Sequence, residues 1–252
     1  MLFRKIFFLP VILLLIPPFL CAKNLYKIEE RLGNYDKTYF IYADKKAHTL
    51  YLMDKDMKVW KRYSVATGEK KGNKLYAGDF RTPEGIYEIT EIYQYHEPWY
   101  ITRMKKRLES MDKTSHEYKT LRKHFKALLK EYKANIKKIR NLNSIFLSAK
   151  DGHFKFGTKK SLGTNSYGPV FMRLSFPGEE DLARYKKAKK EGKLPKNRWG
   201  IYKKPGSGIA IHGTNDNPSL GHNASAGCIR MNNEDIMELS NYVMKGTMVV
   251  ID

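Results

Sequence analysis

Cysteine is almost absent from this chain of 252 residues, which contains only Cys21 and Cys228. Cys21 lies at the edge of an apolar N-terminal segment, so a chain that loses this segment keeps a single thiol. A single thiol has no partner for an intrachain disulfide, which excludes a disulfide-stapled fold. Cys228 is therefore buried, exposed to unwanted reactions, or used in catalysis. The glycines and polar residues around it argue against burial.

Acidic residues are also scarce, with Asp+Glu 26 against Lys+Arg 47 and a formal net charge of +21. Arg4 and Lys5 are the only charged residues among the first 22, so the rest of the chain remains strongly basic without them. This imbalance indicates an anionic partner or surface. It does not distinguish one anionic partner from another.

Long apolar runs are missing beyond residues 1–22. There, Arg4 and Lys5 precede an apolar run that prolines interrupt and that ends at the small residue Ala22. The run is short for a spanning helix, so we predict a secretory signal peptide at 1–22, with an uncleaved anchor as the alternative. We therefore expect an exported protein of the periplasm or cell envelope, membrane-anchored if the signal is retained. Residues 23–38 are taken as a lead-in.

Patterns of metal ligands and phosphate loops are missing as well. None of the histidines other than His212 forms a zinc spacing with cysteines or acids. No glycine-rich loop of the P-loop or Rossmann type occurs. We expect no metal site, and we place His222 in a surface loop. The histidines considered are His48, His96, His116, His124, His153 and His222.

Short β-strands dominate the parts of the chain that do have a pattern. Apolar, aromatic and β-branched residues follow period two through 39–65, with turns at 44–46 and 54–56. Further strands are predicted at 86–90, 167–176, 208–211 and 247–251, and a helix at 233–243. The sequence therefore predicts a mostly β fold.

Residues 104–160 follow a different pattern. Apolar residues recur three or four apart from Tyr118 to Ile139, which predicts an amphipathic helix of about 25 residues. Thr114 and Glu117 predict a capping box at its start. The opposite face carries Lys119, Arg122, Lys123, Lys126, Lys130, Lys133, Lys137 and Lys138. This face is either a solvated surface or a docking site for anionic wall polymer, lipid headgroups or a partner.

A second basic stretch runs from Arg184 to Lys190 and is predicted to form a surface helix and loop.

Cys228 and His212 are the candidate catalytic pair, although a cysteine near a histidine can also be coincidence. A neighbouring imidazolium can lower a thiol pKa from about 8.5 to about 3–4, so His212 is predicted to keep Cys228 as a thiolate. Gly227 would let successive amides point at one spot and form an oxyanion hole. Arg230 suits a substrate carboxylate.

The residues around this pair resemble the signature of the L,D-transpeptidase catalytic domain, the YkuD-like family of peptidoglycan cross-linking enzymes. The resemblance lies in His212-Gly213-Thr214 followed by Ser225-Ala226-Gly227-Cys228-Ile229-Arg230-Met231. Residues 78–85, Gly-Asp-Phe-Arg-Thr-Pro-Glu-Gly, resemble the other recurrent motif of the family. Ala226 departs from the pattern, since many members have His there. The resemblance covers about 39–100 and 165–252.

The resemblance implies the fold class and the domain organisation. We expect an L,D-transpeptidase-type β-sandwich catalytic domain at 39–252, interrupted by a Lys-rich helical insertion at about 104–160. The loop 78–85 is expected to support the active-site side of the sheet. Asp79 and Arg81 are expected to set the geometry of this loop and are assigned no chemistry.

The resemblance also implies the roles of the site residues. Cys228 is the nucleophile and His212 is the base, oriented by the main-chain carbonyl of Gly213. The amides of Gly227 and Cys228 hold the oxyanion, while Arg230 binds substrate carboxylate or braces the loop. The residues assigned to the oxyanion hole and substrate binding are Gly213, Gly227, Ser225 and Arg230. No cofactor is required.

The implied activity is transpeptidation in cell wall biogenesis, with consequences for cell shape. The thiol attacks the bond between a diamino acid and D-alanine in a stem tetrapeptide, and an acceptor amine of a second stem or a protein receives the acyl group. The alternatives are a hydrolytic L,D-carboxypeptidase or endopeptidase of the same fold, and a non-catalytic cell-wall binding module. Peptidoglycan stem peptides are the expected partners, anionic wall polymer or membrane is a possible partner of the Lys-rich helix, and nucleic acid is not expected.

Overall fold

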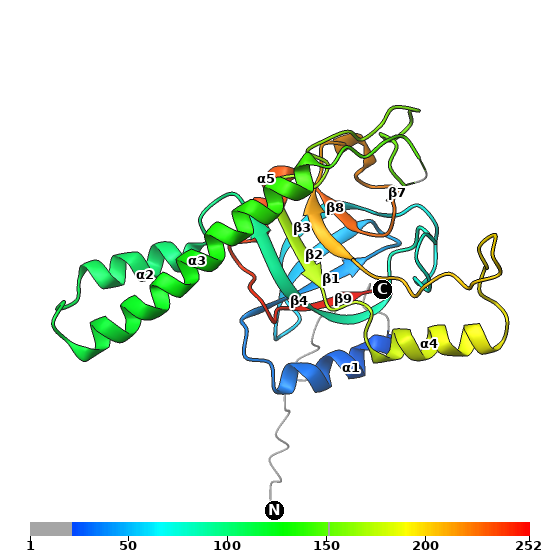
Figure 1. Ribbon diagram of the computed structural model, residues 1–252. Helices are drawn as coiled ribbons and strands as arrows, with labels where there is room; N and C mark the ends of the chain where they lie inside the picture. The colour runs from blue at the N-terminus through cyan, green and yellow to red at the C-terminus, as the bar shows by residue number, and fades with distance from the viewer. Residues whose placement is uncertain (1–21, 151) are drawn as a thin grey trace, which may run out of the picture.

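A single nine-stranded sheet forms the centre of the computed structural model, which describes residues 22–150 and 152–252 (Figure 1). The strand order is β2-β1-β9-β4-β5-β6-β8-β3-β7, and an additional pairing of β2 with β3 closes the sheet into a barrel-like ring. The strands are β1 (Tyr39–Asp44), β2 (Thr49–Asp54), β3 (Val59–Gly68), β4 (Gly85–Gln94), β5 (Val170–Leu174), β6 (Ala210–Gly213), β7 (Asn223–Ser225), β8 (Ile229–Met231) and β9 (Met248–Ile251).

The mostly β fold is confirmed, whereas the expected sandwich of separate sheets is not. Two ten-residue strands, β3 and β4, join the two sides of the ring. β3 pairs with β2 from Val59 to Ser64, then with β8 and β7 up to Gly68. β4 pairs first with β9 and then with β5 in the same way. Hydrogen bonding therefore continues around the sheet.

Apolar side chains fill the inside of the ring. They come from every side of it, because alternate residues of each strand point inward, as in Ile41, Val65, Ile89 and Ile229. The helix α5 (Asn233–Leu239), predicted from the sequence, adds Ile236 and Leu239 to this core. A smaller cluster covers the outer face of β1 and β2.

The helix α1 (Ala22–Gly33) covers that outer cluster with Ile28 and Leu32. It lies in the segment described from the sequence only as a lead-in. It also lies beside α4 (Glu179–Lys190), where Lys27 Nζ is 3.0 Å from Glu180 Oε1 (Figure 1). Residues 1–21, which include most of the predicted signal peptide, lie outside the described residues. Within the described ranges, no helix has the length and apolar character needed to cross a bilayer.

The basic helix predicted from 114 to 140 is present as α3 (His116–Ser144). Its N-cap is Ser115, whose side chain accepts a hydrogen bond from Tyr118 N. The predicted capping box of Thr114 and Glu117 was therefore wrong, because the Thr114 hydroxyl instead donates to Asp112.

A second helix, α2 (Trp99–Glu109), was not predicted and pairs with α3 in a hairpin that projects from the ring (Figure 1).

The apolar side of α3 faces β4 and α2, and Ile139 is fully buried there. Tyr132 Oη donates to Tyr95 O, and Lys138, which was predicted on the opposite face, instead pairs with Glu91 of β4. The lysines of the opposite face, including Lys119, are exposed. The amphipathic pattern is therefore explained by contact with the sheet along one side.

Candidate active site

His212, Cys228 and Arg230 line one cavity of about 700 Å³. His212 lies in β6 and is the register partner of Arg230 in the parallel strand β8. Cys228 directly precedes β8, two residues before Arg230, so both side chains point to the same side of the chain. Parallel pairing of β6 with β8 therefore brings the predicted pair together from opposite ends of the loop between them.

His212 is buried and held in one orientation. Its Nδ1 lies 2.6 Å from the carbonyl oxygen of Gly213, and because a carbonyl only accepts, Nδ1 carries the proton. Tyr167 meets the ring edge-on at 5.0 Å between centroids, and Phe171 stacks on it at 5.8 Å. Nε2 is then the nitrogen with a free lone pair, as a general base requires. The Gly213 contact is the one that the resemblance implies.

Removal from water shifts the pKa of both members of the pair, although the Cys228 side chain is only half-buried. It lowers the pKa of His212 to about 3, against a smaller opposing effect of the Gly213 carbonyl, and the positive charge of Arg230 lowers it further. Burial raises the pKa of the Cys228 thiol, although the Ala210 amide and the charges of Arg230 and Lys74 act the other way. The structure therefore favours a neutral thiol beside a neutral imidazole, which differs from the predicted thiolate.

Ser225 holds the backbone on both sides of Cys228. Its Oγ accepts from Gly227 N at 3.0 Å and donates to Cys228 O at 2.5 Å. The Gly227 amide, expected in the oxyanion hole, is thus already engaged by Ser225. No residue in the described part of the chain accepts a hydrogen bond from the Cys228 N–H. This amide is therefore available to a substrate.

The loop 78–85 packs directly against this turn. A Cβ at Gly227, where φ is +133°, would lie 2.7 Å from Arg81 O, so only glycine fits there. Thr82 Oγ1 donates to Gly227 O at 2.9 Å and accepts from Gly68 N at 2.7 Å. The expected support of the active site by this loop is confirmed by these contacts.

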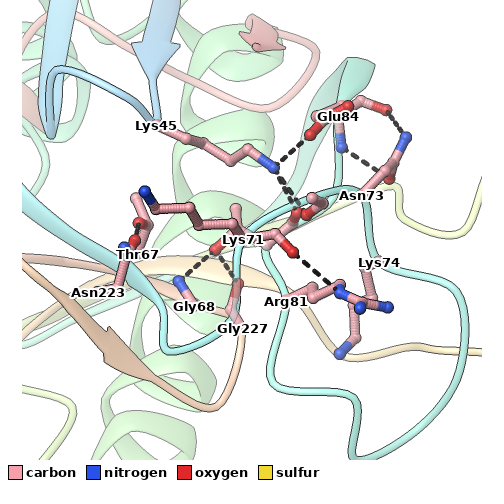
Figure 2. Close-up of polar contacts among 12 residues, drawn as sticks. Lys45, Thr67, Gly68, Lys71, Asn73, Lys74, Arg81, Glu84, Asn223 and Gly227 are labelled. Carbon is pink, nitrogen blue, oxygen red and sulfur yellow. Dashed lines mark hydrogen bonds and ion pairs between the residues drawn. The ribbon is translucent and has the colours of Figure 1, made fainter.

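Asp79 organises the loop 78–85 from within. Its carboxylate accepts hydrogen bonds from Lys74 Nζ at 2.7 Å and from the amides of Leu75, Tyr76 and Arg81. The Arg81 side chain donates to Lys71 O at 3.0 Å (Figure 2). Both residues therefore set the geometry of the loop, as expected.

Arg230 is buried and braces the cavity wall. Its Nη2 donates to Gly152 O at 3.0 Å, and its Nη1 lies 3.5 Å from Asp216 Oδ2. The same Asp216 oxygen accepts from Phe156 N at 3.0 Å. Of the two roles left open by the sequence, these contacts support bracing of the loop.

Several cavity residues were missed by sequence reasoning. Lys74 precedes the recognised loop motif, while Lys150, His153 and Tyr167 follow α3 in a segment without regular strands or helices. Only Tyr167 gave a signal, as the start of a predicted strand. None of the described residues lining the cavity is Asp or Glu, so its charged groups are all cationic.

His222 lies outside this lining, in an exposed loop, and stacks on Phe156 at 4.2 Å between ring centroids. Across residues 22–150 and 152–252, no group of three or more His, Cys, Asp or Glu side chains could hold a metal ion.

Comparison with known proteins gives similarity to putative L,D-transpeptidases. The chain is 52% identical over 42 residues to the putative L,D-transpeptidase YkuD of Bacillus subtilis, which is 17% of this chain and 26% of that protein. The Bacillus licheniformis counterpart is 54% identical over 41 residues, or 16% and 25% of the two chains. The matched stretch thus spans about a quarter of each relative's length.

Solved structures give more distant similarity. Bd1075 of Bdellovibrio bacteriovorus is 18% identical, with 86% of this chain and 48% of that one covered and a TM-score of 0.42. The helical cell shape determining protein Pgp2 of Campylobacter jejuni is 16% identical, with 90% and 54% covered and a TM-score of 0.43.

The family model of the L,D-transpeptidase catalytic domain, YkuD, matches residues 38–251 and so spans nearly all of the chain. The chain therefore belongs to the L,D-transpeptidase catalytic domain family.

Proposed function

We propose that this protein is a peptidoglycan L,D-transpeptidase that uses Cys228 as its nucleophile and His212 as its base. The observation that carries the proposal is that the thiol and the imidazole line one cavity, with the histidine proton held on Nδ1 by Gly213 O. Family membership supports transpeptidase-type chemistry on peptidoglycan. The substrate is a stem tetrapeptide that ends in D-alanine.

In the first half-reaction, the Cys228 sulfur bonds to the carbonyl carbon between the diamino acid and D-alanine. Its proton passes to Nε2 of His212, and the Cys228 N–H hydrogen-bonds the developing oxyanion. The C–N bond then breaks as the imidazolium protonates the leaving amine. Free D-alanine departs, and a thioester remains on Cys228.

In the second half-reaction, an amine of a second stem attacks the thioester carbonyl. His212 takes a proton from this amine and returns it to the departing thiolate, which restores the neutral pair. A neutral resting pair suits this sequence, because an imidazolium at rest could not accept the thiol proton. Charge separation then develops only when substrate fills the cavity.

The charge of the cavity favours an anionic substrate. Lys74, Lys150 and Arg230 line it. Lys74 is paired with Asp79 and Arg230 with Asp216, which leaves Lys150 as the lining cation without an acidic partner among the described residues. A stem peptide that ends in D-alanine carries a free carboxylate at this end. A cationic group such as Lys150 at the cavity would therefore attract it.

The deciding experiment supplies purified protein with a disaccharide-tetrapeptide and identifies the products by mass spectrometry. A cross-linked dimer with release of D-alanine supports transfer, whereas a tripeptide product alone supports the hydrolytic alternative. Cys228→Ser should lose activity by several orders of magnitude while it stays folded, because a hydroxyl is a far weaker nucleophile beside the same base.

A carbapenem adduct on the peptide that contains Cys228 tests the nucleophile independently of the acceptor. An adduct elsewhere, or full activity of Cys228→Ser, would show that Cys228 is not the nucleophile. Absence of any product and any adduct would leave the non-catalytic binding module as the function.

We also propose export of the protein to the cell envelope, on the basis of the signal-like residues 1–22, and contact of the exposed lysines of α3 with anionic wall polymer or membrane. The hairpin of α2 and α3 projects from the ring (Figure 1), and these lysines are exposed. None of these lysines is among the residues that line the cavity.

A further inference from the structure

Thr82 is buried at 1% exposure in the loop 78–85 and is not among the residues that line the cavity. Its hydroxyl has two partners, both of them backbone groups. Gly68 N donates to Oγ1 at 2.7 Å, and Oγ1 lies 2.9 Å from Gly227 O. Because the only hydroxyl proton must go to the acceptor, Thr82 donates to the Gly227 carbonyl.

This bond sets the direction of the next amide. The Gly227 carbonyl and the Cys228 N–H belong to one planar trans peptide, in which the two groups point in opposite directions. Thr82 holds the carbonyl toward the loop 78–85, whereas the Cys228 side chain lies in the cavity. The Cys228 N–H is thereby turned away from Thr82, toward the space where substrate binds.

The surrounding contacts leave this peptide little freedom to rotate. Ser225 Oγ bonds Gly227 N on one side and Cys228 O on the other. The backbone of Gly68, which donates to Thr82, is also packed tightly against the loop 78–85. A Cβ at Gly68 would lie 2.6 Å from both Phe80 O and Thr82 N. Without the Thr82 hydroxyl, the buried Gly227 carbonyl would lose its hydrogen bond and the peptide could turn to find another.

We propose that Thr82 is a positioning residue of the oxyanion hole, which acts on the reaction by aiming the Cys228 amide. The inference rests on the proposed function, since it concerns the oxyanion formed when the Cys228 thiol attacks a carbonyl. Thr82 does not touch substrate. Its contribution therefore falls on the transition state, where the oxyanion develops, and leaves substrate binding unchanged.

The test compares two reactions of the same thiol. Acylation by a carbapenem passes through an oxyanion, whereas alkylation by iodoacetamide is a substitution at a saturated carbon and forms none. Thr82→Val keeps the volume and removes the hydroxyl, and Thr82→Ser keeps the hydroxyl. Thr90→Val is the matched control, because it removes an exposed hydroxyl that bonds Arg173 O.

We expect Thr82→Val to slow carbapenem acylation at saturation by about 10- to 100-fold, less than complete loss of an oxyanion donor. Its half-saturating carbapenem concentration and its iodoacetamide rate should stay within about twofold of the parent. Thr82→Ser should restore most of the acylation rate, and Thr90→Val should match the parent in both reactions.

Parent-like acylation of Thr82→Val would overturn the inference, and so would equal slowing of both reactions, which would indicate a general distortion of the site. Thr82→Ala is measured in parallel, because it fits the same space if Val does not and removes the same hydroxyl. A parent protein that forms no adduct would instead overturn the proposed function and this inference with it.

Discussion

At the scale of single residues, His212 and Cys228 differ in protonation from a thiolate–imidazolium ion pair. Burial lowers the pKa of His212 to about 3 and raises that of Cys228, so each group favours its neutral form. The thiol is then activated by the base during attack and not by charge at rest. This distinction can be measured.

We predict that His212→Ala will leave the pH profile of iodoacetamide labelling of Cys228 nearly unchanged between pH 6 and 9. In the empty site the imidazole carries no charge to stabilise a thiolate. Removing it therefore changes the pKa of the Cys228 thiol little. Acylation by a stem peptide should nevertheless fall by orders of magnitude, because the proton acceptor is gone. A large loss of labelling at pH 6 to 7 alone would restore the ion-pair description.

The pair itself could be predicted from the sequence, because the residue types and the flanking motif are local. Its protonation could not, since that depends on Tyr167, Phe171 and the rest of the cavity wall around His212. The role of Thr82 was missed for a related reason. Its partner Gly227 is 145 residues away, and a threonine inside a turn motif gives no sign of a distant carbonyl.

At the scale of elements, α3 shows what periodicity can and cannot predict. Its apolar spacing predicted the helix, because one side packs on β4 and α2. Its start was missed because Asp112 takes the Thr114 hydroxyl and Ser115 caps the helix. The closure of the ring was missed because it depends on β3 and β4 changing partners along their lengths, which no local pattern records.

We predict that exposed lysines of α3 govern attachment to anionic material. Changing Lys119, Lys123, Lys126, Lys130 and Lys133 to Gln should weaken sedimentation with isolated sacculi or anionic vesicles at low salt. Raising the salt should weaken the parent in the same way, because the Debye length falls from about 10 Å at 0.1 M to about 3 Å at 1 M. Turnover of a small soluble stem peptide should hardly change.

The matched control removes the same number of lysines from α4 and the loop that follows it. Its substitutions to Gln are at Lys186, Lys187, Lys189, Lys190 and Lys193. Equal losses in both variants would mean that net charge, and not the α3 face, governs attachment. Parent-like sedimentation of the α3 variant would mean that this face is only solvated. A collapse of soluble turnover would place α3 in the function of the cavity instead.

At the scale of the whole molecule, the buried neutral His212 links catalysis to stability. An unfolded histidine has a pKa of about 6.5, so below that pH the unfolded chain binds a proton that folded His212 does not. The contribution of His212 to stability is therefore complete above about pH 6.5. It is lost as the pH falls toward 3, at up to about 1.4 kcal/mol per pH unit.

We predict that the free energy of unfolding in urea will fall more steeply with pH for the parent than for His212→Gln. Between pH 7 and pH 5 the difference should approach about 2 kcal/mol, because Gln has no proton to gain. The carboxylates titrate alike in both proteins, so the comparison isolates His212. Parallel losses would show that His212 is protonated in the folded state.

The contact between Thr82 and Gly227 also bears on the order of events during folding. It joins the first half of the chain to the last strands, across 145 residues, so it cannot form until both ends of the domain have arrived. An incompletely folded chain already carries its thiol and its imidazole but has no aligned amide between them. Such a chain would be a poor acyl acceptor, and reactivity would appear only once the ring has closed on itself.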